Sequence, residues 1–515
     1  MKKILMAAAA TMLLMSMTVL TSCTDNSEDN PVTPSEPEQL AEYTIILYGI
    51  GGYNIDCAIL PCFEKLYQGD AEAYKKVNVV VQYKFSTAEN LEAQREYFEV
   101  FPENCGSKTV RWAVDPAKTF YEQVYSRNNI YGDDNADVAS PDSLTSFINW
   151  TARNYPAKKY MLIICDHGGG YMPHCDLPDE APAATTRGLF FDDGYKMKGF
   201  TVNTLRRAIA SADVRIETLF MWACVMNNLE YQFEMKDVCD YVIASTYVLP
   251  GVGGALDVLP SILAQPTTDT EQKLAAFCKA DVEGWDATEG IDEQTRYRDL
   301  TITRTAKLDK LGEVMRKFTD RLCNTYTNGS EHQQQVIDSC TATAVKVQLT
   351  IPSYDVAKYM ASIMKALPEV YDDAFYNRMA QAFNDCLAAQ YYSKYLTDHD
   401  YMVDYSVLLG VQGSYAKILW NEDYKNRIFT PISADVYTPD GTTDKYLIEP
   451  ADNEHYYKMV FSEKGAPWGS TLDDTYGRLA FDRAVGWSRW LKLNRQQPNI
   501  ASQATMNIDL PEINN

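Results

Sequence analysis

The sequence predicts an α/β fold with a mostly parallel central sheet, followed by a helix-rich and mixed C-terminal region. Between residues 43 and 250, short apolar runs without helical periodicity alternate with segments of helical spacing. Strands that are buried on both faces and connected by helices give this alternation. From about residue 261, apolar residues recur at helical spacing, for example over 308–318 and 356–364. The chain is too long for one small core, so two or more packed units are expected.

The elements expected in the α/β part follow from the apolar runs and from the residues that end them. Ser140 or Asp142 is expected to cap a helix over 144–152, and Pro156 to end it before the next strand. Residues 171–198 contain three prolines and are expected to form a long irregular segment. Strands are expected at 43–48, 77–83, 109–115, 160–165, 218–222 and 241–245, and further helices at 56–66, 201–210 and from 225 onward.

Residues 1–22 have the composition of a signal peptide, and residues 23–40 that of an acidic, flexible tether. Two lysines precede an apolar run over 4–20, and small residues follow before Cys23. This pattern resembles a bacterial lipoprotein signal. It implies lipidation of Cys23 and an extracytoplasmic, membrane-anchored protein at the outer membrane or cell surface of a Gram-negative bacterium. The alternative is an ordinary secretion signal, since the run is too short to favour a spanning helix.

The composition excludes some classes of partner. The formal net charge is −23, from 70 acidic and 47 basic residues, which argues against nucleic acid or an anionic membrane surface. It is compatible with basic substrates. The twelve cysteines show no C-x-x-C pair and no regular spacing, so neither a zinc site nor a disulfide framework is expected, and no cofactor is predicted.

A glycine-rich loop over 49–54 separates the first expected strand from the first expected helix. A loop in this position can hold a phosphate group. This one lacks both the G-x-G-x-x-G pattern and the P-loop lysine, so nucleotide binding is not expected.

Two of the expected strands end just before residues that carry chemistry. The strand over 160–165 is followed by His167 and three glycines, and the strand over 218–222 is followed by Cys224. In an open parallel sheet, catalytic groups gather beyond the carboxyl ends of the strands. His167 and Cys224 are therefore expected to face one another, which places a thiol beside a base.

Short motifs surround both residues. They are Asp142-Ser143-Leu144 with Phe147 and Trp150, Tyr155 to Tyr160, Asp166 to Gly170, Ala223 to Met226, Asn228 to Glu230, and Ser245 with Pro250-Gly251. These motifs resemble the clostripain family of cysteine peptidases, whose fold is the caspase-like α/β sandwich. The resemblance covers most of residues 43–255 and fades through the C-terminal half. His167 and Cys224 stand 57 positions apart (224 − 167), close to the roughly 50 residues between the corresponding pair in caspases.

The resemblance implies a cysteine endopeptidase with Cys224 as nucleophile and His167 as general base and acid. It implies an oxyanion hole made by the backbone N–H groups of Gly168 and Cys224. No third residue orients the histidine in the family, so none is nominated. Family members are often activated by cleavage after the histidine, here within 171–198, where Arg187 is the best basic candidate. Calcium stimulates some relatives, and since the sequence has no D-x-D-x-D-G loop, calcium dependence is left open.

Two positions depart from the family pattern, and both concern the substrate. The family commonly has an acidic residue two positions before its cysteine, at the base of the S1 pocket, and this sequence has Trp222. An indole can stack on a guanidinium group but cannot neutralise it. Thr246 stands where the family often has Glu. Trp222 and Thr246 are the expected substrate-binding residues, and the sequence leaves both a basic and an apolar or small P1 residue open.

Two functions from different classes are therefore alternatives. One is a lipid-anchored cysteine endopeptidase that cuts peptides or proteins, with a peptidase domain over 41–260 and an aromatic-rich C-terminal region over 261–515. The other is a surface lipoprotein that keeps the caspase-like scaffold and binds protein or glycan without catalysis. The dyad residues and the glycines are all present, which favours the peptidase.

Overall fold

A computed structural model describes the greater part of the chain from residue 40 to residue 494. The described residues group into one compact unit. The expected signal peptide, Cys23, nearly all of the tether, and Arg187 lie outside the described residues. Within the described part, no helix combines the length and apolarity needed to cross a membrane. The described residues are 40–52, 54–95, 105–126, 129–132, 136–168, 170, 189–192, 198–249, 254–266, 269–288, 297–345, 347, 353–409 and 476–494.

The described residues form a nine-stranded sheet in the order β12-β10-β9-β8-β5-β1-β2-β3-β4. The five central strands, from β9 to β2, are parallel, and two antiparallel strands flank them on each side. The prediction of a mostly parallel α/β sheet is confirmed for this centre. The strands are β1 Ala41–Ile50, β2 Val77–Lys84, β3 Thr109–Ala113, β4 Ile130–Gly132, β5 Ala157–Cys165, β8 Ile216–Trp222, β9 Cys239–Ala244, β10 Asp299–Arg304 and β12 Leu387–Tyr392.

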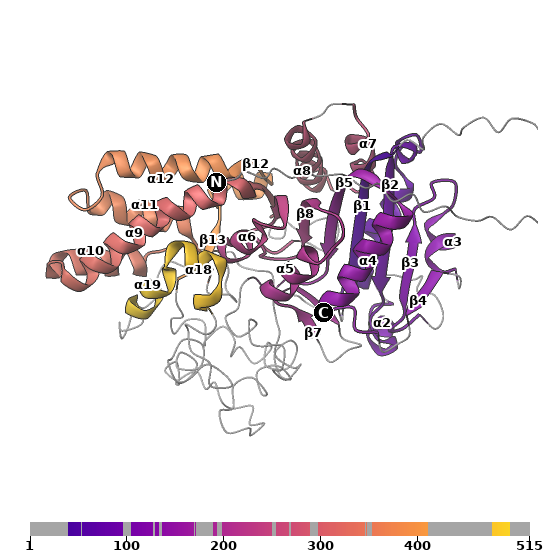
Figure 1. The fold of residues 1–515 in the computed structure, drawn as a ribbon, viewed down its shortest axis with the longest axis horizontal. Helices are drawn as coiled ribbons and strands as arrows, with labels where there is room; N and C mark the ends of the chain where they lie inside the picture. Colours follow the sequence, from indigo (N-terminus) through magenta and orange to yellow (C-terminus); the bar gives the residue numbers. More distant parts are fainter. Residues whose placement is uncertain are drawn as a thin grey trace, which may run out of the picture. The chain divides into compact units, whose positions relative to one another are not determined.

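The central strands are buried on both faces. In β1, Ile45 and Leu47 pack into one apolar cluster, whereas Ile46 and Tyr48 pack into another. Successive positions can therefore all be apolar, which is why these runs lack periodicity. One set of helices covers the face of Ile46: α4 (Pro141–Asn154), α5 (Val202–Ala210) and α6 (Leu229–Met235). The opposite face is covered by α1 (Asp56–Glu64), α7 (Leu259–Leu263) and α8 (Thr270–Asp286) (Figure 1). The result is the α/β sandwich that the sequence predicts.

The helices that build these layers are mostly short and capped by polar side chains. Two small antiparallel pairs accompany them, β6 Leu189–Asp192 with β7 Lys198–Phe200, and β11 Ser353–Asp355 with β13 Ser406–Leu408. The helices are α1 Asp56–Glu64, α2 Ala88–Ala93, α3 Phe120–Val124, α4 Pro141–Asn154, α5 Val202–Ala210, α6 Leu229–Met235, α7 Leu259–Leu263, α8 Thr270–Asp286, α9 Leu308–Asn328, α10 Glu331–Ala342, α11 Val356–Ala366, α12 Asp373–Cys386, α13 Lys394–Asp398, α18 Ala480–Val485 and α19 Trp487–Asn494.

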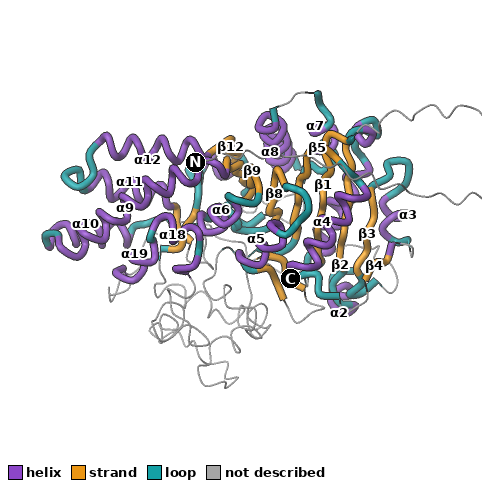
Figure 2. The backbone as a smooth tube through the Cα atoms, in the orientation of Figure 1, coloured by secondary structure: helices purple, strands orange, loops and turns teal. Residues whose placement is uncertain are grey.

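The C-terminal region extends the central sheet. Strand β10 pairs antiparallel with β9, and β12 pairs antiparallel with β10. Helices α9, α11, α12, α18 and α19 bury side chains in the apolar cluster that also holds α4 to α6. Figure 2 shows α9 to α12 gathered beside the β12 edge of the sheet. The change in composition near residue 260 therefore does not divide the described chain into two compact units.

Two helices begin at positions that the sequence left open or misplaced. Ser140, not Asp142, caps α4, and its hydroxyl accepts a hydrogen bond from the backbone of the first turn. Helix α6 begins at Leu229 and not at residue 225, because the Asn228 side chain caps it. Residues 225–228 are therefore a loop, a difference that matters for the site described below.

Strands β6 and β7 lie in a stretch expected to be irregular. Their pairing could not be foreseen because the run is short and follows several prolines. A buried ion pair fixes β6: the Lys84 Nζ at the end of β2 lies 2.7 Å from an Asp192 carboxylate oxygen and donates to the Ala136 carbonyl at 2.8 Å. Both charged side chains are fully buried, so either one alone would be costly.

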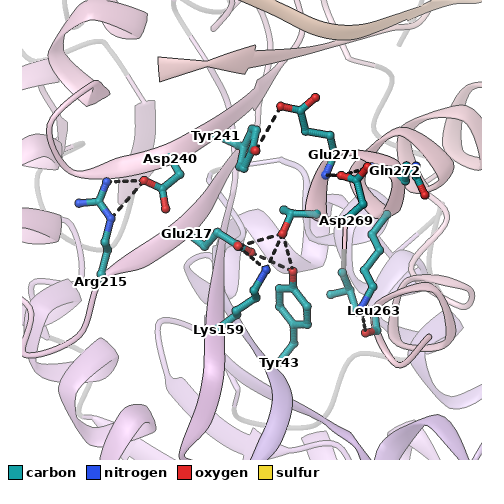
Figure 3. A network of polar contacts seen from close by, with 12 residues as sticks. Tyr43, Lys159, Arg215, Glu217, Asp240, Tyr241, Leu263, Asp269, Glu271 and Gln272 are labelled. Atoms are coloured by element: carbon teal, nitrogen blue, oxygen red, sulfur yellow. Dashed lines mark hydrogen bonds and ion pairs between the residues drawn. The ribbon is translucent and has the colours of Figure 1, made fainter. Parts of the chain in front are cut away.

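A polar network links the amino-terminal ends of the central strands (Figure 3). Glu217 of β8 accepts hydrogen bonds from the Tyr43 hydroxyl at 2.9 Å and the Thr270 hydroxyl at 3.0 Å. It also pairs with Lys159 of β5 at 2.7 Å. Asp269 caps α8 by accepting from two backbone N–H groups. These contacts tie three strands to α8 at the end of the sheet opposite the predicted site.

Candidate active site

His167 and Cys224 follow adjacent strands at equivalent positions. Cys165 of β5 pairs with Trp222 of β8, so each candidate residue lies two positions beyond a paired residue. The chains then touch: a Cβ atom placed on Gly168 would lie 2.1 Å from the Cys224 carbonyl oxygen and 2.7 Å from its nitrogen. The structure thus brings the two segments together at the carboxyl edge of the sheet, where the sequence placed them.

Cys224 lies at this junction, and the residue is partly accessible to solvent. Its Sγ lies 3.7 Å from the Leu249 carbonyl oxygen, to which the S–H can donate. Burial raises the pKa of the Cys224 thiol to about 11, and the nearby Asp166 carboxylate adds to the rise. Backbone hydrogen bonds from Gly168 and from Cys224 itself oppose it. The thiol is therefore protonated at neutral pH and needs a base to become a nucleophile.

Alkylation of Cys224 by iodoacetamide in the free protein is expected to accelerate from neutral pH to beyond the ordinary thiol pKa of 9.0, because only the thiolate reacts and its pKa is raised to about 11. Peptide mapping by mass spectrometry at a series of pH values measures the rate, with Cys224→Ala as the blank. A rate that levels off near neutral pH would instead indicate a thiolate–imidazolium pair at rest.

The loop after Cys224 is held in a strained conformation. Val225 has a φ of 55°, in the left-handed region that a β-branched residue rarely adopts. Such strain persists only where surrounding contacts impose it. Here the Val225 N–H donates to the Tyr247 carbonyl at 2.9 Å, and the Asn227 N–H donates to the Ser245 carbonyl at 2.8 Å. The loop after β9 thus fixes the turn that follows the candidate nucleophile.

Residues far along the chain support the same loop. The Asn227 side chain donates to the Asp404 carbonyl at 2.9 Å, and the Ser406 N–H donates to the Asn227 carbonyl at 3.1 Å. In α6, the buried Glu230 accepts from the Tyr476 hydroxyl at 2.7 Å. The C-terminal region therefore contributes to the scaffold of the site.

Trp222 and Thr246, the predicted substrate-binding residues, are both buried. Trp222 is 5% exposed, and its ring stacks on Phe220 with centroids 6.2 Å apart. Thr246 is 1% exposed; its N–H donates to the Asp299 carboxylate at 2.8 Å, and its hydroxyl accepts from Asn227 at 2.8 Å. Their role toward a substrate stays a prediction.

Sequence reasoning did not nominate Asn54, whose Oδ1 lies 2.7 Å from His167 Nε2. Asn54 belongs to the glycine-rich loop after β1, next to β5 in the sheet. In that loop Gly52 has a φ of 51°, and a Cβ there would lie 1.9 Å from Asp166 Oδ1 and 3.2 Å from His167 Cδ2. The sequence feature that could have indicated this contact is the glycine run at the carboxyl end of β1.

Among the described residues, no group of three or more His, Cys, Asp or Glu side chains is placed to hold a metal ion.

Comparison with known proteins gives matches of different extent. Clostripain of Hathewaya histolytica is 26% identical over 149 residues, which is 27% of this chain and 27% of that relative. Iotapain, a secreted C11 cysteine protease from Bacteroides thetaiotaomicron, is 16% identical to this chain, and the two structures superpose with a TM-score of 0.49. That match covers 69% of this chain and 88% of iotapain. An inactive zymogen C11 protease from Parabacteroides distasonis is 13% identical, with a TM-score of 0.46. That match covers 78% of this chain and 100% of the zymogen chain. A family model described as the clostripain family of C11 peptidases matches residues 72–473. Because this match spans most of the sequence and includes both His167 and Cys224, the chain belongs to the clostripain family.

Proposed function

We propose that the protein is a cysteine endopeptidase that hydrolyses peptide bonds through Cys224 and His167. The observation that carries the proposal is the contact between the Gly168 and Cys224 main chains, which sets the residue after the histidine against the nucleophile. Family membership supports the same reading. A structural cysteine would need neither a histidine at the equivalent position after the neighbouring strand nor the strained turn after it.

The proposed reaction uses the thiol in its neutral resting state. His167 removes the thiol proton as sulfur attacks the scissile carbonyl carbon, and the carbonyl oxygen becomes an oxyanion. The backbone N–H groups of Gly168 and Cys224 oppose the rise in the pKa of the Cys224 thiol, which supports their assignment to that oxyanion. The imidazolium then protonates the departing amine, and a thioester remains on Cys224. Water, deprotonated by His167, hydrolyses this acyl-enzyme and restores the thiol.

The substrate preference follows from the carboxylates around Trp222 and Thr246. A basic P1 side chain in a buried pocket needs a carboxylate partner. Asp299 already accepts from Ser245 and from the Thr246 and Tyr247 N–H groups. Nearby, Asp281 is paired with the fully buried Arg298 and accepts from the Ala255 N–H at 3.0 Å. We therefore infer that cleavage is not restricted to Arg or Lys at P1 and includes apolar or small residues.

The test is cleavage of a P1-diverse peptide library by residues 40–515, in parallel with Cys224→Ala, read by mass spectrometry. The proposal expects cuts by the wild type that the variant does not make, at P1 residues beyond Arg and Lys. Cuts only after Arg or Lys would refute the preference but leave the peptidase in place. The absence of cuts by either protein, also after limited proteolysis and with added calcium, would favour the binding-lipoprotein alternative.

We further propose that the peptidase is extracytoplasmic and anchored through lipidated Cys23. The apolar run before this cysteine and the acidic tether after it support the proposal. In a bacterial host that processes lipoproteins, the full chain is expected in the membrane fraction and Cys23→Ser in the soluble fraction. A Cys23→Ser protein that stays with the membrane would contradict the lipid anchor.

A further inference from the structure

We propose that Asn54 is a positioning residue that orients His167 and sets which ring nitrogen carries the proton. The proposal rests on the endopeptidase function proposed above. The Asn54 Oδ1 lies 2.7 Å from His167 Nε2. An amide oxygen can only accept a hydrogen bond, so the proton must reside on Nε2. Nδ1 then carries the lone pair and is the nitrogen that removes the proton from the Cys224 thiol.

The backbone of the glycine-rich loop after β1 positions Asn54 beside His167. In the sheet, Gly49 of β1 lies opposite Cys165 of β5, so the loops after both strands leave the same edge side by side. Any side chain at Gly52 would collide with the Asp166 carboxylate, which is why the loop can lie against the residues around His167 only with glycine there. The Ile55 N–H donates to the Gly51 carbonyl at 3.0 Å and closes the turn that contains Asn54.

The residue that begins α1 anchors the other end of this turn. Asp56 is fully buried and accepts hydrogen bonds from the Tyr83 hydroxyl at 2.9 Å, the Gln94 amide at 3.0 Å and the Ser86 N–H at 3.3 Å. A carboxylate held by three donors has little freedom to move. Asn54 therefore sits on a short segment that is fixed on both sides, as a residue that orients a catalytic group requires.

The chemistry favours an amide in this position. The titratable groups around the loop are Asp56 and Cys57 of α1, Asp166 after β5 and Cys224 after β8. When His167 takes the thiol proton it becomes positively charged, and its bond to the Asn54 oxygen becomes charge-assisted and stronger. A neutral amide thus stabilises the transition state more than the resting state. A carboxylate would also stabilise the imidazolium at rest and remove the base at neutral pH.

Two variants of residues 40–515 test the proposal. Asn54→Leu keeps the size and removes the acceptor, so kcat is expected to fall by about 10- to 100-fold with KM little changed. Asn54→Asp keeps the acceptor and adds a charge, so the acid limb of the kcat/KM profile should move to higher pH, and above that limb the variant should retain more activity than Asn54→Leu. Asn328→Leu, which changes an exposed asparagine at the end of α9, is the matched control and should behave as the wild type.

Each outcome decides the question. Wild-type kinetics in Asn54→Leu would overturn the role of Asn54 and leave the peptidase standing. An Asn54→Asp protein with an unshifted pH profile would also overturn it, and this readout holds even if Asn54→Leu fails to fold. If the wild type shows no hydrolysis that depends on Cys224, both the proposed function and the role of Asn54 fall.

Discussion

Replacing His167 with alanine is expected to lower kcat/KM for peptide hydrolysis by about 10²- to 10⁴-fold, the range that a general base and acid contributes. The loss follows because burial raises the pKa of the Cys224 thiol to about 11, so without a base the nucleophile is almost entirely protonated at neutral pH. Steady-state kinetics on the best peptide of the library measures the effect. Added imidazole should restore part of the rate, since it can take the vacated position.

His332→Ala is the matched control, because His332 is exposed on α10 and has no part in the proposed reaction. It should leave kcat/KM unchanged. A His167→Ala protein that hydrolyses peptides at the wild-type rate would show that another group takes the thiol proton, and it would remove the proposed mechanism.

Gly168→Ala is expected to damage both activity and stability. The added Cβ would lie 2.1 Å from the carbonyl oxygen and 2.7 Å from the nitrogen of Cys224, and both are main-chain atoms that cannot rotate away. The chains must separate, which moves the Gly168 N–H away from the proposed oxyanion position. We expect kcat to fall by about 10²- to 10³-fold and the free energy of unfolding to fall by about 1–3 kcal/mol. Kinetics and denaturant unfolding measure the two effects.

Gly284→Ala provides the contrast for this substitution. Gly284 is exposed in α8, and a Cβ there would meet no heavy atom within 4 Å. Alanine should raise the free energy of unfolding by about 0.5–1 kcal/mol and leave the kinetics unchanged. If Gly168→Ala resembled Gly284→Ala in both measurements, the close contact at Cys224 would have no bearing on catalysis.

The sequence could predict that the segments carrying His167 and Cys224 meet at one edge of the sheet, because strand ends are local features. Each residue follows an apolar run that ends sharply, and neighbouring parallel strands present their carboxyl ends at one edge. Because Cys165 pairs with Trp222, His167 and Cys224 each lie two positions beyond the paired ends of their strands. The central strands were equally accessible to prediction, because burial on both faces leaves a continuous apolar run.

The support for His167 could not be predicted in the same way. Asn54 meets His167 across 113 residues of sequence, and no local pattern marks that contact. The glycine loop does not match phosphate-binding patterns, and its packing against Asp166 depends on the register of β1 with β5. Likewise, nothing near Asn227 indicates that Ser406 will hold it.

The environment of Trp222 depends on packing that the sequence does not specify. Its position two residues before Cys224 corresponds to the base of the S1 pocket in the family pattern. In the structure a Cβ on Gly254 would lie 3.0 Å from the indole, and the ring is 5% exposed. Trp222 belongs to the apolar cluster that also holds α7 and α8, and the placement of these helices over this face of the sheet is a tertiary property. The C-terminal strands β10 and β12 show the same limit, since composition alone predicted mainly helices there.

The most direct test of the central claim is the site of covalent capture by a peptidyl chloromethyl ketone. Wild type, Cys224→Ala and His167→Ala would be treated with the reagent and mapped by mass spectrometry, with the partly exposed Cys57, Cys323 and Cys340 as internal comparators. The proposed mechanism predicts one adduct, on Cys224, formed much more slowly in His167→Ala and absent from Cys224→Ala. Equal labelling of the comparator cysteines, or peptide cleavage that persists in Cys224→Ala, would contradict it.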